Sequence, residues 1–140
     1  MHNARFPAAR FKGFLSFEGH QGYLADLADY TLGSDDDYRH LDGDVFIIGI
    51  GQPELRLKAY HKWQQKGVEF LTLVHPNAHV AENAQLGEAN IFANGCFVSC
   101  NTQLGNANFL NGFVIMGHDA RLGPGNFFGT FTPLLGEAGL

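Results

Sequence analysis

An apolar residue recurs at every sixth position along the second half of the chain. The run reads Val74, Val80, Leu86, Phe92, Val98, Leu104, Leu110, Met116, Leu122, Phe128 and Leu134 without interruption. Four residues after each of these positions stands, in most cases, a small side chain such as Ala78 or Cys96. A period of six fits neither the roughly 3.6-residue period of an amphipathic helix nor the alternation of a half-buried strand. The pattern therefore indicates a repeat protein.

A longer period of eighteen residues overlies the first. It is visible in Gly87, Gly105 and Gly123, and again in Asn90, Asn108 and Asn126. Three six-residue units make one coil with three flat faces and a turn at each corner, and stacked coils bury a continuous core that no single repeat could form. The sequence therefore predicts a mainly β fold, a parallel β-helix of hexapeptide repeats, with asparagine ladders along the stack. The 18 glycines among 140 residues fit the many turns of such a coil.

The residues before Val74 follow a different pattern. They predict a small βαβ unit, with a strand over Asp44–Ile50, a helix from Pro53 that stops at Gly67, and a strand over Val68–Val74. The apolar stripe of the helix consists of Leu55, Ala59, Tyr60 and Trp63. Further upstream, we expect a short strand within Gly13–Phe17 and mostly loop over Leu24–Tyr38. Two domains are therefore expected, a partial α/β domain over 1–73 and a β-helix over 74–140.

Charge and composition exclude several classes of protein. With 9 basic and 14 acidic residues the net charge is −5, and no basic patch is present, so a nucleic-acid partner is not expected. Apolar runs such as Val45–Ile48 are far shorter than the roughly 18 residues of a membrane-spanning helix. The two cysteines, Cys96 and Cys100, provide no disulfide framework. They fit a reducing compartment, and we expect the protein in the cytoplasm.

A βαβ unit that leads into hexapeptide coils resembles the sugar acyltransferases that N-acetylate UDP-4-amino sugars or O-acetylate sialic acids. The resemblance is best from Val45 to Leu140, and its most specific segment, Asn111 to Asp119, is similar to the family's Asn-x6-His-Asp/Glu motif. The segments IGIGQPELR and LVHPNAHV also look like family features. The resemblance implies a left-handed β-helix after an incomplete Rossmann-like domain. It further implies a homotrimer, acetyl-CoA bound between adjacent subunits, and a sugar or nucleotide-sugar substrate.

His118 carries the chemistry that this resemblance implies. It follows the core position Met116 by two residues, and so is expected near a corner, where a side chain can leave the stack. Transfer of an acyl group from a thioester needs a base that works near neutral pH, which imidazole provides, and a neighbouring carboxylate can fix its tautomer. The resemblance makes His118 the general base, Asp119 its orienting partner and Asn111 a supporting polar group. The alternative is a surface histidine at a corner with no task.

Gly136 lies eighteen residues after His118 and is expected one coil further along at the same corner. The resemblance implies that its backbone N–H faces the thioester carbonyl of acetyl-CoA, where an oxyanion needs a donor. An ordinary turn glycine is the alternative. Cys100 lies one coil before His118, and Cys96 occupies a small inward position of the repeat.

Two further hypotheses belong to other classes. Leu140 falls on the phase of Leu86, Leu104 and Leu122, each of which is followed by Gly, so the chain stops in mid-coil; a Gly-rich opening loop of the family is also missing. These features predict a fragment, and one alternative is a truncated, non-catalytic solenoid that serves assembly. The other is a metal-dependent hydratase like the hexapeptide carbonic anhydrases, with His75 and His79 as ligands. A catalytic zinc needs a third ligand in matching phase, so no metal is expected.

Overall fold

The structure is a computed structural model that describes residues 9–18 and 25–140. They fall into two compact units, one that ends at Asp44 and one from Val45 to Leu140. Leu24 and the first residues of the expected domain 1–73 lie outside the described residues. No helix within the described ranges has the length and apolar character needed to cross a membrane.

The first unit contains two short strands and one 3-10 helix. Strand β1 (Phe14–Ser16) confirms the strand expected within Gly13–Phe17, and it pairs in parallel with β2 (Thr31–Ser34). The segment expected to be mostly loop therefore contains β2, and also the 3-10 helix η1 (Ala25–Tyr30). The prediction missed β2 because four residues carry no clear alternation and the strand is defined by its pairing with β1.

Asp44 ends this unit and holds a small polar cluster together. Its carboxylate accepts hydrogen bonds from the Leu41 N–H at 2.8 Å, the Tyr38 hydroxyl at 2.8 Å and the Lys12 ammonium at 2.7 Å. The Leu41 N–H first, and then Lys12, lower the pKa of Asp44 to about 2.

The second unit opens with the expected βαβ arrangement. Strands β3 (Val45–Phe46) and β4 (Glu69–Phe70) pair in parallel, and helix α1 (Pro53–Gln65) connects them, with Pro53 in its first turn. Both strands are shorter than predicted. The Leu71 N–H donates to the Phe46 carbonyl, whereas the Leu73 N–H donates to the Asn90 carbonyl. The segment Val68–Val74 thus changes partner midway, and its second half is already the first strand of the repeat.

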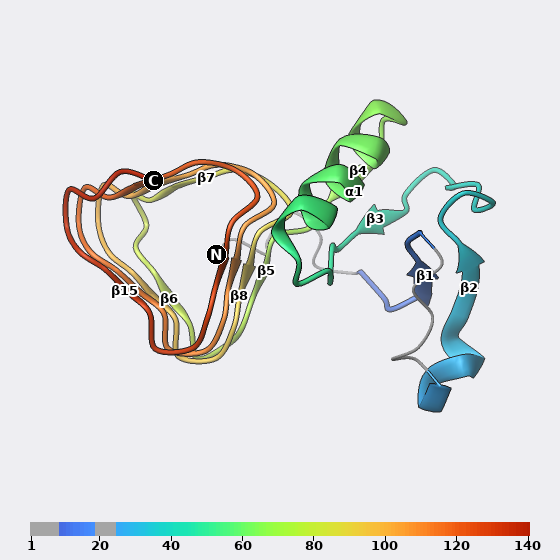
Figure 1. The fold of residues 1–140 in the computed structure, drawn as a ribbon, viewed down its shortest axis with the longest axis horizontal. Coiled ribbons are helices and arrows are strands. Elements are labelled where there is room, and N and C mark those ends of the chain that lie inside the picture. The colour runs from blue at the N-terminus through green and yellow to red at the C-terminus, as the bar shows by residue number, and fades with distance from the viewer. Residues whose placement is uncertain (1–8, 19–24) are drawn as a thin grey trace. The chain divides into compact units, whose positions relative to one another are not determined.

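The remaining strands form the predicted parallel β-helix. They are β5 (Leu73–Val74), β6 (His79–Val80), β7 (Gln85–Leu86), β8 (Ile91–Phe92), β9 (Phe97–Val98), β10 (Gln103–Leu104), β11 (Phe109–Leu110), β12 (Ile115–Met116), β13 (Arg121–Leu122), β14 (Phe127–Phe128) and β15 (Pro133–Leu134). Each strand pairs in parallel with the strand eighteen residues away, as Gln103 does with Gln85 and with Arg121. Figure 1 shows the coils lying one over another.

Three sheets make up the three faces of the solenoid. We call β5, β8, β11 and β14 the helix-covered face, β6, β9, β12 and β15 the apolar face, and β7, β10 and β13 the polar face. The first residue of each strand points outward and the second inward. On the apolar face the outward residues are His79, Phe97, Ile115 and Pro133, and on the polar face they are Gln85, Gln103 and Arg121.

The sixth-position residues fill the core, as the period predicts. Phe92, Val98, Leu110 and Met116 are each at most 1% exposed, and Val74, Val80, Leu86, Phe128 and Leu134 pack around the buried cluster. The expected asparagine ladder is also present. The Asn108 N–H donates to Asn90 Oδ1 at 2.8 Å, and the Asn126 N–H donates to Asn108 Oδ1 at 2.9 Å. Buried amides thus satisfy one another from coil to coil.

Helix α1 packs on the helix-covered face, beside β5 and β8 in Figure 1. Of the predicted stripe, Ala59, Tyr60 and Trp63 are buried, and Leu55 is half-buried. The residue that joins them is Arg56, which the stripe did not include. It is fully buried and donates to the carbonyls of Ile48, Ile50, Ala89, Ala107 and Asn108. Burial lowers the pKa of Arg56 to about 10.

Candidate active site

His118 and Asp119 form an ion pair at the corner between β12 on the apolar face and β13 on the polar face. His118 Nδ1 lies 2.7 Å from Asp119 Oδ2, and the side chains are 61% and 47% exposed. The corner turns sharply, and Asp119 takes up a left-handed backbone conformation with a φ of 59°. Asp is among the residue types that tolerate this conformation best. The two side chains therefore leave the stack, as expected for a corner.

The charge state of Asp119 determines the tautomer of His118. The pKa of Asp119 lies below its usual value, first because of the hydrogen bond with His118 and then because of one from Asn101. An ionised carboxylate only accepts hydrogen bonds, so the proton of neutral His118 stands on Nδ1. Nε2 then carries the free lone pair, which is the arrangement that a general base needs.

Gly136 lies directly against the His118 ring. A Cβ on Gly136 would lie 3.0 Å from His118 Nε2 and 3.1 Å from Cε1, so the absence of a side chain leaves the ring its place. The Glu137 N–H donates to the His118 carbonyl, and the Asp119 N–H donates to the Cys100 carbonyl, which fixes the order Cys100, His118, Gly136 along this corner. Gly136 is exposed, and none of the backbone hydrogen bonds found among the described residues uses its N–H.

Asn111 is not brought to this corner. It lies between β11 and β12, at the opposite edge of the apolar face, so that β12 separates it from His118 in the same chain. Its Oδ1 accepts a hydrogen bond from the Gly112 N–H at 2.8 Å. The sequence spacing of the motif thus corresponds to one whole face of the coil.

Two polar residues that the sequence analysis did not single out lie at the His118 corner. Asn101 is one coil before Asp119, and Asn83 is one coil before Asn101. The Asn83 amide donates to Asn101 Oδ1 at 2.7 Å, and the Asn101 amide hydrogen-bonds Asp119. Their eighteen-residue spacing was a signal that could have identified them.

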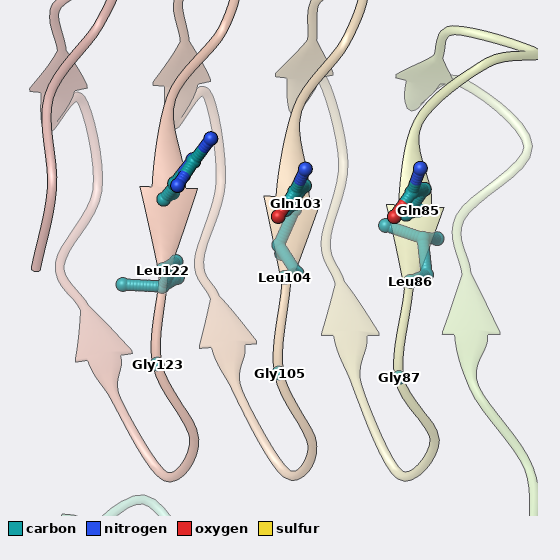
Figure 2. A pocket seen from close by; sticks show the side chains of 9 residues that line it. Gln85, Leu86, Gly87, Gln103, Leu104, Gly105, Leu122 and Gly123 are labelled. Atoms are coloured by element: carbon teal, nitrogen blue, oxygen red, sulfur yellow. The ribbon is translucent and has the colours of Figure 1, made fainter.

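A shallow groove of about 460 Å³ lies on the neighbouring polar face. Figure 2 shows its lining, where Gly87, Gly105 and Gly123 are aligned beside Gln85, Leu86, Gln103 and Leu104 on successive coils. Neither His118 nor Asp119 lines the groove. It follows the glycine column, where close contact between coils excludes side chains.

The other candidate residues have structural partners. His75 Nδ1 accepts a hydrogen bond from the Asn77 N–H, and the ring of His79 stacks on Phe97 with centroids 4.8 Å apart. Within the described ranges, no three His, Cys, Asp or Glu side chains come together as a metal site would require. Cys96 is buried in the core, where burial raises its pKa, and Cys100 is exposed.

Comparison with known proteins was made by sequence and by structure. No protein-family model matches the sequence, and no curated protein matches it. Solved structures do match. WeeI from Acinetobacter baumannii AYE has a TM-score of 0.79 and 20% identity, over 96% of this chain and 64% of its own. A mutant of perosamine N-acetyltransferase from Caulobacter crescentus, in complex with CoA and GDP-perosamine, has a TM-score of 0.74 and 24% identity, over 78% of this chain and 53% of its own.

The acetyltransferase domain of PglB from Neisseria gonorrhoeae FA1090 also matches, with a TM-score of 0.51 and 14% identity, over 78% of this chain and 66% of its own. At these identities the likeness concerns the fold. The fold is a left-handed parallel β-helix. The handedness implied by the family resemblance is thus confirmed. The chain spans less than two thirds of the length of the first two of these proteins.

Proposed function

We propose that the protein is an acetyl-CoA-dependent acyltransferase that transfers an acetyl group to an amino or hydroxyl group of a sugar. The observation that carries this proposal is the His118–Asp119 pair, whose exposed ring lies against a glycine without a side chain. The fold supports it, because a perosamine N-acetyltransferase bound to CoA and GDP-perosamine has the same fold. A nucleotide-linked amino sugar or a sialic-acid-type sugar is therefore the proposed acceptor.

In this mechanism His118 acts as a general base, without a covalent intermediate on the protein. Nε2 takes the proton of the sugar amine or hydroxyl as its nitrogen or oxygen bonds to the thioester carbonyl carbon. His118 then returns the proton to the sulfur as the carbon–sulfur bond breaks. Asp119 stabilises the imidazolium that exists in between. A positioned base of this kind contributes about 10²–10⁴-fold to the rate.

Gly136 is the proposed donor to the carbonyl oxygen of the thioester, which gains negative charge during attack. Its N–H lies beside the His118 ring, is exposed and has no acceptor among the backbone hydrogen bonds of the described residues. A preorganised N–H at such a position is worth more than a side-chain donor that must first be ordered. Within this proposal, residues 74–140 form the acyltransferase domain and residues 1–73 contribute to binding the nucleotide sugar.

We further propose a homotrimer, since the apolar face is suited to self-association. Phe97 and Ile115 point outward from it with 44% and 51% of their surface exposed. At its edge, Phe113 and Phe131 stack with ring centroids 5.1 Å apart and remain 45% and 73% exposed. Exposed apolar patches of this kind mark interaction sites.

A three-fold axis in front of the apolar faces would also complete the site. Asn111 and His118 belong to one coil and stand at the two edges of that face. When three copies turn this face to a common axis parallel to the stack, the Asn111 corner of one copy meets the His118 corner of the next at the same height. The proposed trimer thus gives Asn111 its role. Two free cysteines agree with the proposed cytoplasmic location.

The test is acetyl transfer from acetyl-CoA to a panel of nucleotide-linked amino sugars and sialic acids, followed by thiol release. His118→Ala is expected to lower kcat by about 10²-fold or more. His61→Ala, an exposed histidine on α1, is the matched control and should keep the wild-type rate. Equal rates in wild type and His118→Ala would remove the base assignment. Absence of both turnover and CoA binding would favour the structural solenoid.

A further inference from the structure

Three polar residues form a ladder at the corner that carries His118. Asn83, Asn101 and Asp119 are spaced by eighteen residues, so each lies over the next on successive coils. The Asn83 Nδ2 donates to Asn101 Oδ1 at 2.7 Å, and the Asn101 backbone N–H donates to Asn83 Oδ1 at 3.2 Å. Two reciprocal hydrogen bonds therefore hold the two amides in register.

These bonds determine which way the Asn101 amide faces. Its oxygen is occupied by Asn83, so its NH₂ group is directed to the following coil, where the Asp119 carboxylate accepts from it. Asp119 Oδ2 is at the same time within 2.7 Å of His118 Nδ1. The carboxylate has acceptor sites enough for both donors. The chain of contacts thus runs from Asn83 through Asn101 and Asp119 to His118.

An exposed carboxylate needs such support. Asp119 is 47% exposed and His118 is 61% exposed, and hydrogen bonds between exposed side chains compete with water. With His118 as its only partner, the Asp119 side chain could rotate away and the ring could adopt either tautomer. A second donor from a rigid coil restricts this rotation.

We infer that Asn101 is a positioning residue for the reaction proposed above. Its amide, held by Asn83, keeps the Asp119 carboxylate facing His118 Nδ1, which keeps the proton on that nitrogen and leaves Nε2 free to act as base. The inference rests on the proposed acyltransferase function for its role, while the tautomer of His118 is a property of the free protein.

The backbone offers a purely structural reason for the same residue. Asn101 has a φ of 57°, and asparagine adopts this left-handed conformation more readily than most residues. Two variants separate the explanations. Asn101→Gly keeps the backbone freedom and removes the amide. Asn101→Asp keeps the shape and the tolerance of left-handed φ, and replaces the donor by an acceptor.

The tautomer can be measured by ¹⁵N NMR of histidine-labelled protein without substrate, with the His118 signal assigned by its loss in His118→Ala. In wild type, neutral His118 is expected mainly with the proton on Nδ1. Both Asn101→Gly and Asn101→Asp should shift it toward the Nε2-protonated form, and Asp119→Asn should do so most strongly. Asn94→Asp is the control, because Asn94 belongs to a ladder with Asn77 at another corner and its Oδ1 only accepts.

Activity provides the second readout. Both Asn101 variants should lower kcat about five- to twentyfold, a part of the roughly 10²–10⁴-fold that a general base supplies, and leave the KM for acetyl-CoA unchanged. An unchanged His118 tautomer in folded Asn101→Gly or Asn101→Asp overturns the inference, whatever the activity. A shifted tautomer in a protein without acetyl transfer would instead refute the proposed function and leave the positioning of His118 by Asn101 in place.

Discussion

Gly105 lies where two coils of the solenoid come into close contact. A Cβ at this residue would lie 2.9 Å from the carbonyl carbon of Gly123 and 2.9 Å from the nitrogen of Pro124. Both are backbone atoms, so relief of the contact requires the next coil to shift. Gly105→Ala is therefore expected to lower the free energy of unfolding by about 1–3 kcal/mol, measured by urea denaturation.

Gly129 provides the matched control for this substitution. A Cβ there would meet no atom within 4 Å, and its backbone is outside the left-handed region. Gly129→Ala should be neutral or stabilise by about 0.4–1 kcal/mol, because it reduces the freedom of the unfolded chain. Similar losses in both variants would contradict the steric explanation.

Single residues of the site differ in how far the sequence predicts them. The eighteen-residue period placed Gly136 one coil after His118, and the structure confirms this stacking. The same period relates Asn101 to Asp119, but asparagine is so common at left-handed corners that the spacing by itself does not indicate a task. Asn111 and His118 are close in sequence, yet a six-residue unit of this repeat crosses a whole face, so seven residues separate two corners.

At the scale of elements, the attachment of α1 depends on one buried charge. Arg56 is fully buried, and its guanidinium donates to five backbone carbonyls that belong to the loop after β3 and to the coils. Arg56→Met should lower the free energy of unfolding by about 2–4 kcal/mol, because it leaves these buried acceptors without donors. Thermal and urea unfolding would measure this loss.

Arg56→Lys and Lys58→Met are the companions of that variant. A lysine keeps the charge but offers three donors at one point instead of a planar fork, so it should recover only part of the loss. Lys58 is exposed on the same helix, and its removal should change stability by no more than about 0.5 kcal/mol. Full recovery in Arg56→Lys would show that charge, and not the pattern of donors, holds α1.

The same helix shows where prediction of elements from sequence stops. The positions of Pro53 and Gly67 define its ends, and Ala59, Tyr60 and Trp63 face the core as the apolar stripe requires. Apolar periodicity cannot find Arg56, because unpaired carbonyls on the opposing coil create the need for it. Likewise, Val68–Val74 is one continuous apolar-rich run in the sequence. It divides between two sheets because the strands that pair with it are different.

For the whole molecule, the period of the repeat determines neighbours within a chain but not what covers each face. The helix-covered face has α1, the polar face exposes Gln103 and Arg121, and the apolar face exposes Phe97 and Ile115. A core that closes within one chain does not require the last of these faces to be apolar. The proposed trimer accounts for it, and also for the separation of Asn111 from His118.

That trimer predicts complementation between two inactive variants. In a site shared between neighbours, His118→Ala removes the base from one side and Asn111→Ala removes the amide from the other. When the two variants are co-expressed in equal amounts and mix at random, about one interface in four combines an intact His118 with an intact Asn111. Acetyl transfer should therefore recover to about a quarter of the wild-type rate in the mixture, while each variant alone stays near its own low rate.

Ile115→Glu supplies the control on assembly, because it places a carboxylate on the apolar face between the two corners. Sedimentation should find this variant as a monomer and the wild type as a trimer, and the variant should lose activity with its His118 corner intact. A mixture of His118→Ala and Asn111→Ala that remains as inactive as its components, although sedimentation finds trimers, would place Asn111 outside the shared site. A monomeric, fully active wild type would refute the arrangement, since β12 would then separate two residues that have to act on one substrate.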